Sequence, residues 1–120
     1  MNILRKLNIT ASPWESKPEE VDKAYIRVRG TVPRSRHKIC NVITPFYEGV
    51  NEREAIETRA NAKLIAASPE MLESFFFIIA EIEKVEIENI NDFLDQLHCI
   101  CCTNIEKATG KSWNEINKLM

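Results

Sequence analysis

The sequence predicts an α+β fold, with a small antiparallel sheet in the N-terminal part packed against a helix and an antiparallel helical hairpin in the C-terminal part. Two patterns indicate it. Apolar and polar residues alternate between Ala24 and Thr31, the period of a half-buried strand, and apolar residues recur at helical spacing from residue 52 onward. At 120 residues we expect a single domain, with a basic, β-rich part over 1–47 and an α-helical part over 50–120.

The chain begins with an arm, for which a short strand around residues 2–4 is the expectation. Pro13 and Trp14 then indicate a turn-rich entry. An isolated tryptophan beside a proline turn often closes the edge of a core. We therefore expect Trp14 to anchor this entry against the sheet.

The strand over 24–31 places Ile26 and Val28 on its apolar face. A second strand is predicted over 37–44, and the intervening loop contains Pro33. The simplest result is an antiparallel sheet of two or three strands.

Two helices are predicted next, joined at Ser68 and Pro69. The first runs from about 52 to 67 after Asn51 as N-cap, and its expected inner face contains Ile56, Ala60, Leu64 and Ala67. The second runs from Pro69 to about 86, with Ser68 as N-cap. A proline is tolerated at the first helical position because the backbone N–H that it lacks would have no partner within the helix. Its expected apolar stripe contains Leu72, Phe75, Phe76, Ile79 and Ile82.

A third helix is predicted from about 89 to 108, where apolar residues keep the helical period for five turns: Ile90, Phe93, Leu94, Leu97, Cys101, Ile105 and Ala108. Gly110 is placed to end it in a left-handed conformation. Because only residues 86–88 separate the second and third helices, we expect an antiparallel hairpin. Ser112 can cap a last helix over 113–120.

Composition narrows the class of protein. The apolar and charged fractions, 44% and 28%, are those of ordinary globular proteins. No signal peptide or membrane-spanning run is evident, and the expectation is a cytoplasmic protein with no membrane association. Three of the four cysteines crowd onto one predicted helix, which favours reduced thiols over a disulfide framework.

Charge is distributed unevenly along the chain. Residues 1–47 carry nine Lys and Arg against four Asp and Glu, whereas residues 70–120 carry four against ten. A chain with one anion-attracting and one anion-repelling portion is poorly suited to coat DNA or RNA.

Residues 59–72 read Arg-Ala-Asn-Ala-Lys-Leu-Ile-Ala-Ala-Ser-Pro-Glu-Met-Leu. The stretch resembles the signature Glu-Ala-Asn-Ala-Arg-Leu-Ile-Ala-Ala-Ala-Pro-Glu-Leu-Leu of small phage and prophage proteins of mostly unknown function. Residues 10–15 and 106–110 are similar to the segments with which such proteins often begin and end, although Arg59 stands where they usually have Glu. The resemblance implies a phage accessory protein in a bacterial host, and the anti-Thoeris sponges, which sequester a nucleotide signal, are the first group to compare.

A basic cluster on the predicted strand, loop and second strand is the first candidate site. It contains five cations interleaved with Tyr25 and His37, and Tyr47 follows the second strand; the cations are Arg27, Arg29, Arg34, Arg36 and Lys38. Guanidinium groups bind phosphate in a bidentate manner, so the cluster suits a phosphate-bearing ligand on which Tyr25 or Tyr47 could stack. The alternative is a solvated basic strand that discourages aggregation.

Arg59, Asn61 and Lys63 form the second candidate. Asparagine is unfavourable inside a helix, so Asn61 suggests a specific hydrogen bond. Its partner is either the sheet, a ligand or a neighbouring subunit.

His98, Cys99 and Cys102 form a third cluster, which could present three metal ligands on one helical face. A structural zinc site usually has four ligands, and no fourth is evident. The favoured interpretation is therefore small residues filling a helical core, with no metal and no cofactor.

Two functions remain open from the sequence. The first is a non-enzymatic protein that counters host immunity by sequestering a cyclic nucleotide or ADP-ribose derivative through Tyr25, Arg27, Arg29, Arg34, Arg36, Arg59 and Asn61. The second is a module whose acidic hairpin binds and inhibits a host or phage protein. A homo-oligomer is expected in either case, because the second helix has apolar residues on more sides than a hairpin and a small sheet can cover.

Overall fold

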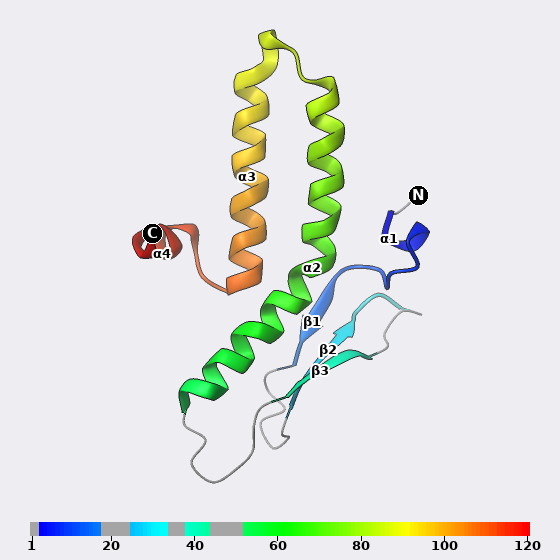
Figure 1. The fold of residues 1–120 in the computed structure, drawn as a ribbon, viewed down its shortest axis with the longest axis vertical. Helices are drawn as coiled ribbons and strands as arrows, with labels where there is room; N and C mark the ends of the chain where they lie inside the picture. The colour runs from blue at the N-terminus through cyan, green and yellow to red at the C-terminus, as the bar shows by residue number, and fades with distance from the viewer. Residues whose placement is uncertain (1–2, 18–24, 34–37, 44–51) are drawn as a thin grey trace.

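The computed structural model of the chain describes residues 3–17, 25–33, 38–43 and 52–120. Its elements are α1 (Ile3–Lys6), β1 (Trp14–Ser16), β2 (Tyr25–Gly30), β3 (Lys38–Ile43), α2 (Glu52–Lys84), the 3₁₀ turn η1 (Ile87–Asn89), α3 (Ile90–Thr109) and α4 (Trp113–Leu119). The α+β prediction is confirmed. The sheet lies against the first half of α2, and the second half of α2 forms a hairpin with α3 that extends away from the sheet (Figure 1).

The sheet has three antiparallel strands in the order β1-β2-β3. Trp14 lies opposite Gly30, and Val28 lies opposite Cys40. The sequence predicted the second and third strands but assigned β1 to a turn, because three residues are too few to show a period. The arm at 3–6 is helical, so the expected strand there is wrong.

A small core lies between the sheet and α2. Ile26 and Val28 point toward the helix and are 7% and 0% exposed, and they meet Ala62 and Ala66. Trp14 packs against this cluster from the edge, as predicted, and its indole N–H donates to the carbonyl of Thr10 over 3.1 Å. Small alanines let the helix lie close to the sheet.

The predicted inner face of the first helix is mostly wrong. Ile56 and Leu64 are 55% and 50% exposed, whereas Thr58, Ala62 and Ala66 are buried. The prediction followed the larger apolar side chains. The sheet instead selects the small ones, since only they permit a close approach. Of the predicted set, only Ala67 is buried.

Residues 52–84 form one helix of 33 residues, not two. Pro69 lies inside it, and Figure 1 shows α2 bending partway along its length, as helices with an internal proline do. Pro69 cannot donate the backbone bond that the carbonyl of Ile65 would accept. The Ser68 hydroxyl donates to that carbonyl over 2.7 Å. Ser68 therefore replaces the missing backbone hydrogen bond and is not the N-cap of a second helix.

The hairpin and the last helix follow the prediction closely. α3 ends at Gly110, which has a left-handed φ of 70° and donates its N–H to the carbonyl of Glu106. Ser112 caps α4 through a capping box with Glu115. Within the hairpin, the Asn104 amide donates to the Ser74 hydroxyl over 2.8 Å, and Lys107 pairs with Glu70.

Burial differs from the prediction in the hairpin. Phe75, Phe76, Ile79 and Ile82 were expected along a core stripe, yet each is at least 40% exposed. In α3 only Ala108 is buried. α3 contacts α2, η1 and α4 but no strand, so neither face of the hairpin is covered by the sheet.

Among the helices in the described residues, none combines the length and hydrophobicity needed to span a bilayer.

Candidate functional site

The outer surface of the sheet gathers basic side chains from all three strands. Because Ile26 and Val28 point toward α2, the alternate residues Tyr25, Arg27 and Arg29 lie on the opposite face, as the sequence predicted. Lys38 joins them from β3, and Lys17 joins them from the residue after β1, whose backbone N–H donates to the carbonyl of Arg27 over 2.9 Å. We call these five residues the basic sheet face: Lys17, Tyr25, Arg27, Arg29 and Lys38.

Among the residues that the structure describes, one acidic side chain lies on this face. Glu15 is directly opposite Arg29 in the β1-β2 pairing and forms an ion pair with Lys17. A shallow cleft of about 300 Å³ opens beside it, lined by Glu15, Lys17, Arg29, Gly30 and Thr31. That volume is at the lower end of the range for small-molecule sites. The Glu15 carboxylate lies between Lys17 and Arg29 and partly neutralises their positive charge. A phosphate that bound here would take the place of this carboxylate beside the two cations.

The aromatic part of the face is Tyr25. The Lys38 ammonium lies 5.8 Å from the centre of the Tyr25 ring, within the range of a cation–π interaction. This contact holds an aromatic surface and a cation together, the pair of groups that a nucleotide base and its phosphate require.

The other predicted site residues are distributed differently. Arg34, Arg36 and Tyr47 lie outside the described residues. Arg59 and Asn61 are exposed on α2, which covers the inner surface of the sheet. The sheet therefore separates Arg59 and Asn61 from Arg27 and Arg29 within one chain.

Lys63, the neighbour of Asn61 in the sequence motif, has a structural position. The Lys63 ammonium group lies beside Gly110, where a larger residue would meet it, so the Lys63 side chain lies against the C-terminal end of α3. A cation there is favoured by the partial negative charge of the helix end. Lys63 thus ties the first half of α2 to the hairpin.

Sequence reasoning missed Lys17. The signal was the alternation of Glu15 and Lys17 after Trp14, in a segment too short to be recognised as a strand without its pairing with β2. Recognising the pairing would have placed Glu15 and Lys17 on the same face as Arg27 and Arg29.

The cysteine cluster has little of the geometry of a metal site. The Cys102 thiol is 3.7 Å from Nε2 of His98, while Trp113 packs edge-on against the His98 ring at 6.1 Å between centres. In the parts of the chain that the structure describes, no three His, Cys, Asp or Glu residues are grouped so as to hold a metal ion. Partial burial and the nearby Glu106 carboxylate raise the pKa of Cys102, which disfavours the thiolate that metals bind.

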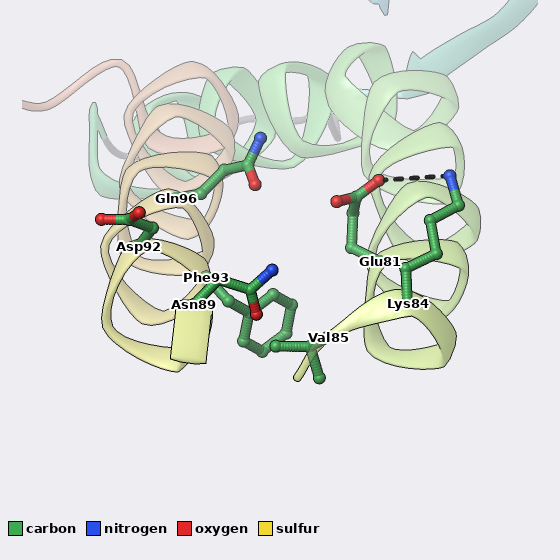
Figure 2. A pocket seen from close by; sticks show the side chains of 7 residues that line it. All are labelled: Glu81, Lys84, Val85, Asn89, Asp92, Phe93 and Gln96. Carbon is green, nitrogen blue, oxygen red and sulfur yellow. Dashed lines mark ion pairs between the residues drawn. The ribbon is translucent and has the colours of Figure 1, made fainter. Parts of the chain in front are cut away.

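The hairpin tip is the most acidic part of the described chain. Residues 81–95 contain six acids and one lysine, a net charge of −5. Figure 2 shows Glu81 from α2 and Gln96 from α3 pointing into the space between the helices, with Val85 and Phe93 near the turn. These side chains line an opening of about 190 Å³. The tip would attract a basic partner and repel an anion.

Comparison with known proteins identifies one relationship. Residues 1–112 match the model of the protein family described as Salmonella phage P22 protein Y8K6. No curated protein and no solved structure matches the chain.

Proposed function

Since the chain belongs to the family of Salmonella phage P22 protein Y8K6, we propose that it is a non-enzymatic phage accessory protein that binds and sequesters a phosphate-bearing nucleotide signal of the host. The binding surface in this proposal is the basic sheet face. The observation that carries it is that β2, β3 and the residue after β1 place Lys17, Arg27, Arg29 and Lys38 on the same surface of the sheet as Tyr25, with Lys38 over the Tyr25 ring. The ligand would be a cyclic nucleotide or an ADP-ribose derivative, and its capture would blunt an immune response that the nucleotide triggers.

The chemistry of the face supports this class of ligand. Each desolvated Arg–phosphate contact contributes roughly 1.5–3 kcal/mol, and a base stacked on Tyr25 adds roughly 1–3 kcal/mol. Arg27 and Arg29 are each half-buried, which holds their guanidinium groups close to the sheet and reduces the entropy lost on binding. Arg59 and Asn61 could contribute only from another subunit.

Calorimetric titration of the purified protein with cyclic nucleotides and ADP-ribose isomers tests the proposal. Arg27→Ala/Arg29→Ala should weaken binding about a hundredfold or more, because two charge-assisted contacts are lost. The matched control is Arg5→Ala/Lys6→Ala, which removes the same charge from two exposed positions of α1 and should leave binding within about threefold.

Arg59→Ala/Asn61→Ala asks separately whether α2 of another subunit reaches the ligand. Equal binding by the wild type and the Arg27/Arg29 variant would show that the basic sheet face is a solvated surface and not the binding site. Failure of any nucleotide to bind the wild type would reject sequestration.

A second function is favoured by the acidic hairpin tip. Six carboxylates within 15 residues, on a helical unit that extends away from the sheet, suit a basic surface of a host or phage protein that the hairpin would inhibit. The check is cross-linking in host lysate with Glu83→Lys/Glu86→Lys as the matched variant. A partner captured by the wild type and lost in this variant, in a salt-dependent manner, would support it, and a partner retained by both would not.

A further inference from the structure

The chain exposes more surface than a compact protein of its mass. Its accessible surface is 8771 Å², whereas a folded monomer of 13.8 kDa is expected to expose about 6,600 Å². Its radius of gyration is 17.4 Å against about 13.6 Å for a compact domain of 120 residues. The shortest dimension is only 17 Å, so the molecule is close to one layer of helices thick.

Much of the uncovered apolar surface lies on one side of the hairpin. Helical geometry places a set of apolar residues of α2 and α3 on the same side, and we call this set the apolar hairpin face: Met71, Phe75, Ile78, Ile82, Ile90, Leu94, Leu97, Cys101 and Ile105. An open groove of about 190 Å³ lies between the two helices at the end of this face away from the hairpin turn, where its lining includes Met71, Phe75 and Cys101. Phe75, Ile82 and Leu94 are 57%, 53% and 52% exposed. The face contains no charged residue.

The opposite side of the hairpin has a different composition. Its residues are mainly polar or charged and include Glu73, Lys84, Asp92, Cys99 and Thr103. Phe77 is the large apolar residue on that side, where it lines a separate groove with Ile3 and Gln96. The apolar hairpin face is therefore the broadest apolar surface of the hairpin, although Phe76 and Ile79 are also exposed outside it. A broad apolar face is typical of a helix pair against which another layer packs.

We propose that a second copy of this chain covers the apolar hairpin face, so that two hairpins pack as a four-helix bundle. The excess surface of about 2,100 Å² per chain lies within the roughly 1,000–2,500 Å² that each partner buries in a stable homodimer. An uncharged apolar face is complementary to itself, which is what a two-fold symmetric interface requires.

Charge selects the orientation of the two hairpins. The tip, residues 81–95, has a net charge of −5, while the opposite end, residues 63–73 and 104–111, has three cations and three acids. A parallel dimer would bring two tips of −5 together. An antiparallel dimer places each tip beside a neutral end, so the bundle is antiparallel.

Light scattering coupled to size-exclusion chromatography of the full chain tests the dimer. The wild type should be a dimer at about 10–100 μM, which is far above the dissociation constants of such interfaces. Phe75→Glu should convert it to a folded monomer, because a carboxylate would be buried in the interface. Phe77→Glu is the matched control, the same change two residues away on the opposite side, and should remain a dimer. A monomeric wild type, or a dimer lost in Phe77→Glu and kept in Phe75→Glu, would overturn the proposal.

Thiol labelling of the wild type provides a second measurement, which does not depend on whether a variant folds. Cys99 and Cys101 are both exposed in the single chain, but only Cys101 lies on the apolar hairpin face. In the wild-type dimer, maleimide should label Cys99 at least tenfold faster than Cys101, and dilution below the dissociation constant should remove the difference. Equal labelling at high concentration would contradict coverage by a second copy. The dimer does not require nucleotide binding, so titration and light scattering can fail independently.

Discussion

The two halves of the molecule bury apolar side chains to very different extents. Where the first half of α2 meets the sheet, Ile26, Val28, Ala62 and Ala66 are nearly inaccessible to solvent. In the hairpin formed by residues 70–109, only Ala108 is buried, and this region contains most of the large apolar side chains that are exposed in the described residues. Both regions have regular secondary structure. They differ in whether a second layer is present.

The difference shows which interactions stabilise each half. The sheet and α2 form two layers that remove side chains from water, which is the main favourable contribution to folding. The hairpin is a single layer, and its internal contacts include polar pairs such as Asn104 with Ser74 and Lys107 with Glu70. A solvent-exposed ion pair such as Lys107 with Glu70 contributes little, about 0–1 kcal/mol. A partly buried hydrogen bond such as Asn104 with Ser74 contributes about 0.5–1.5 kcal/mol. The hairpin thus gains most from whatever covers its apolar face.

The largest expected effect separates the two surfaces of the sheet. Ile26→Ala should lower the free energy of unfolding by about 2–5 kcal/mol, because it leaves a cavity in the small core beneath α2. Ile43→Ala is the matched control, since Ile43 is 75% exposed on the outer surface, and should change it by less than about 0.5 kcal/mol. Urea denaturation followed by circular dichroism measures both. Similar losses in the two variants would mean that both surfaces of the sheet are covered.

The sequence was sufficient to predict much of the fold. Alternation in residues 25–30 and the helical period in α3 depend on local chemistry, and so do the signals at Gly110 and Ser112. The continuous α2 was not predicted, because Pro69 is normally a reason to end a helix and only the Ser68 hydroxyl shows how the lost bond is replaced. The buried faces of the helices were also mispredicted, because the element that packs against a helix determines which of its side chains are buried.

The candidate site was predicted to a similar extent. Strand period alone placed Tyr25, Arg27 and Arg29 on one surface, and the structure agrees. Lys17 was missed because its place depends on the pairing of β1 with β2. The separation of Arg59 and Asn61 from the strand arginines could not be foreseen, because it depends on which surface of the sheet α2 covers.

Hydrogen exchange should sharpen the contrast between the halves. In the proposed dimer, amides of residues 75–105 should gain about threefold protection or more for each tenfold increase in protein concentration, because opening of the hairpin is linked to dissociation. Amides of Ile26 and Val28 depend on contacts within one chain and should change much less. Exchange read by mass spectrometry at two concentrations distinguishes the regions. Concentration-independent exchange in both would mean that the hairpin is stable without a second layer.

A double-mutant cycle tests how the two halves of α2 are joined. Ser68→Ala should destabilise the wild type by about 0.5–1.5 kcal/mol, since the Ile65 carbonyl loses its donor. In a Pro69→Ala background the restored backbone N–H can bond that carbonyl, so the same change should cost less than about 0.3 kcal/mol. The coupling is measured from the free energies of unfolding of the four proteins. Equal costs in both backgrounds would show that the hydroxyl does not replace the missing bond.

The smallest expected effect compares a thiol in each half. Burial raises the pKa of the Cys40 thiol in β3, whereas Cys99 lies exposed on the hairpin. Only the thiolate attacks iodoacetamide, so at pH 8 Cys40 should react several-fold more slowly than Cys99, and its rate should keep rising as the pH approaches its raised pKa. A thiol whose pKa is higher in the folded state than in the unfolded state stabilises the fold below the unfolded pKa, and this contribution is lost as the pH rises through the folded pKa. Cys40→Ser should therefore reduce the decline in stability in alkaline solution. Thermal melts between about pH 7 and pH 10 would record this, because that range surrounds the ordinary thiol pKa of roughly 8.5. Cys40 reacting as fast as the exposed Cys99 at pH 8 would show that packing against the core does not shield the Cys40 thiol.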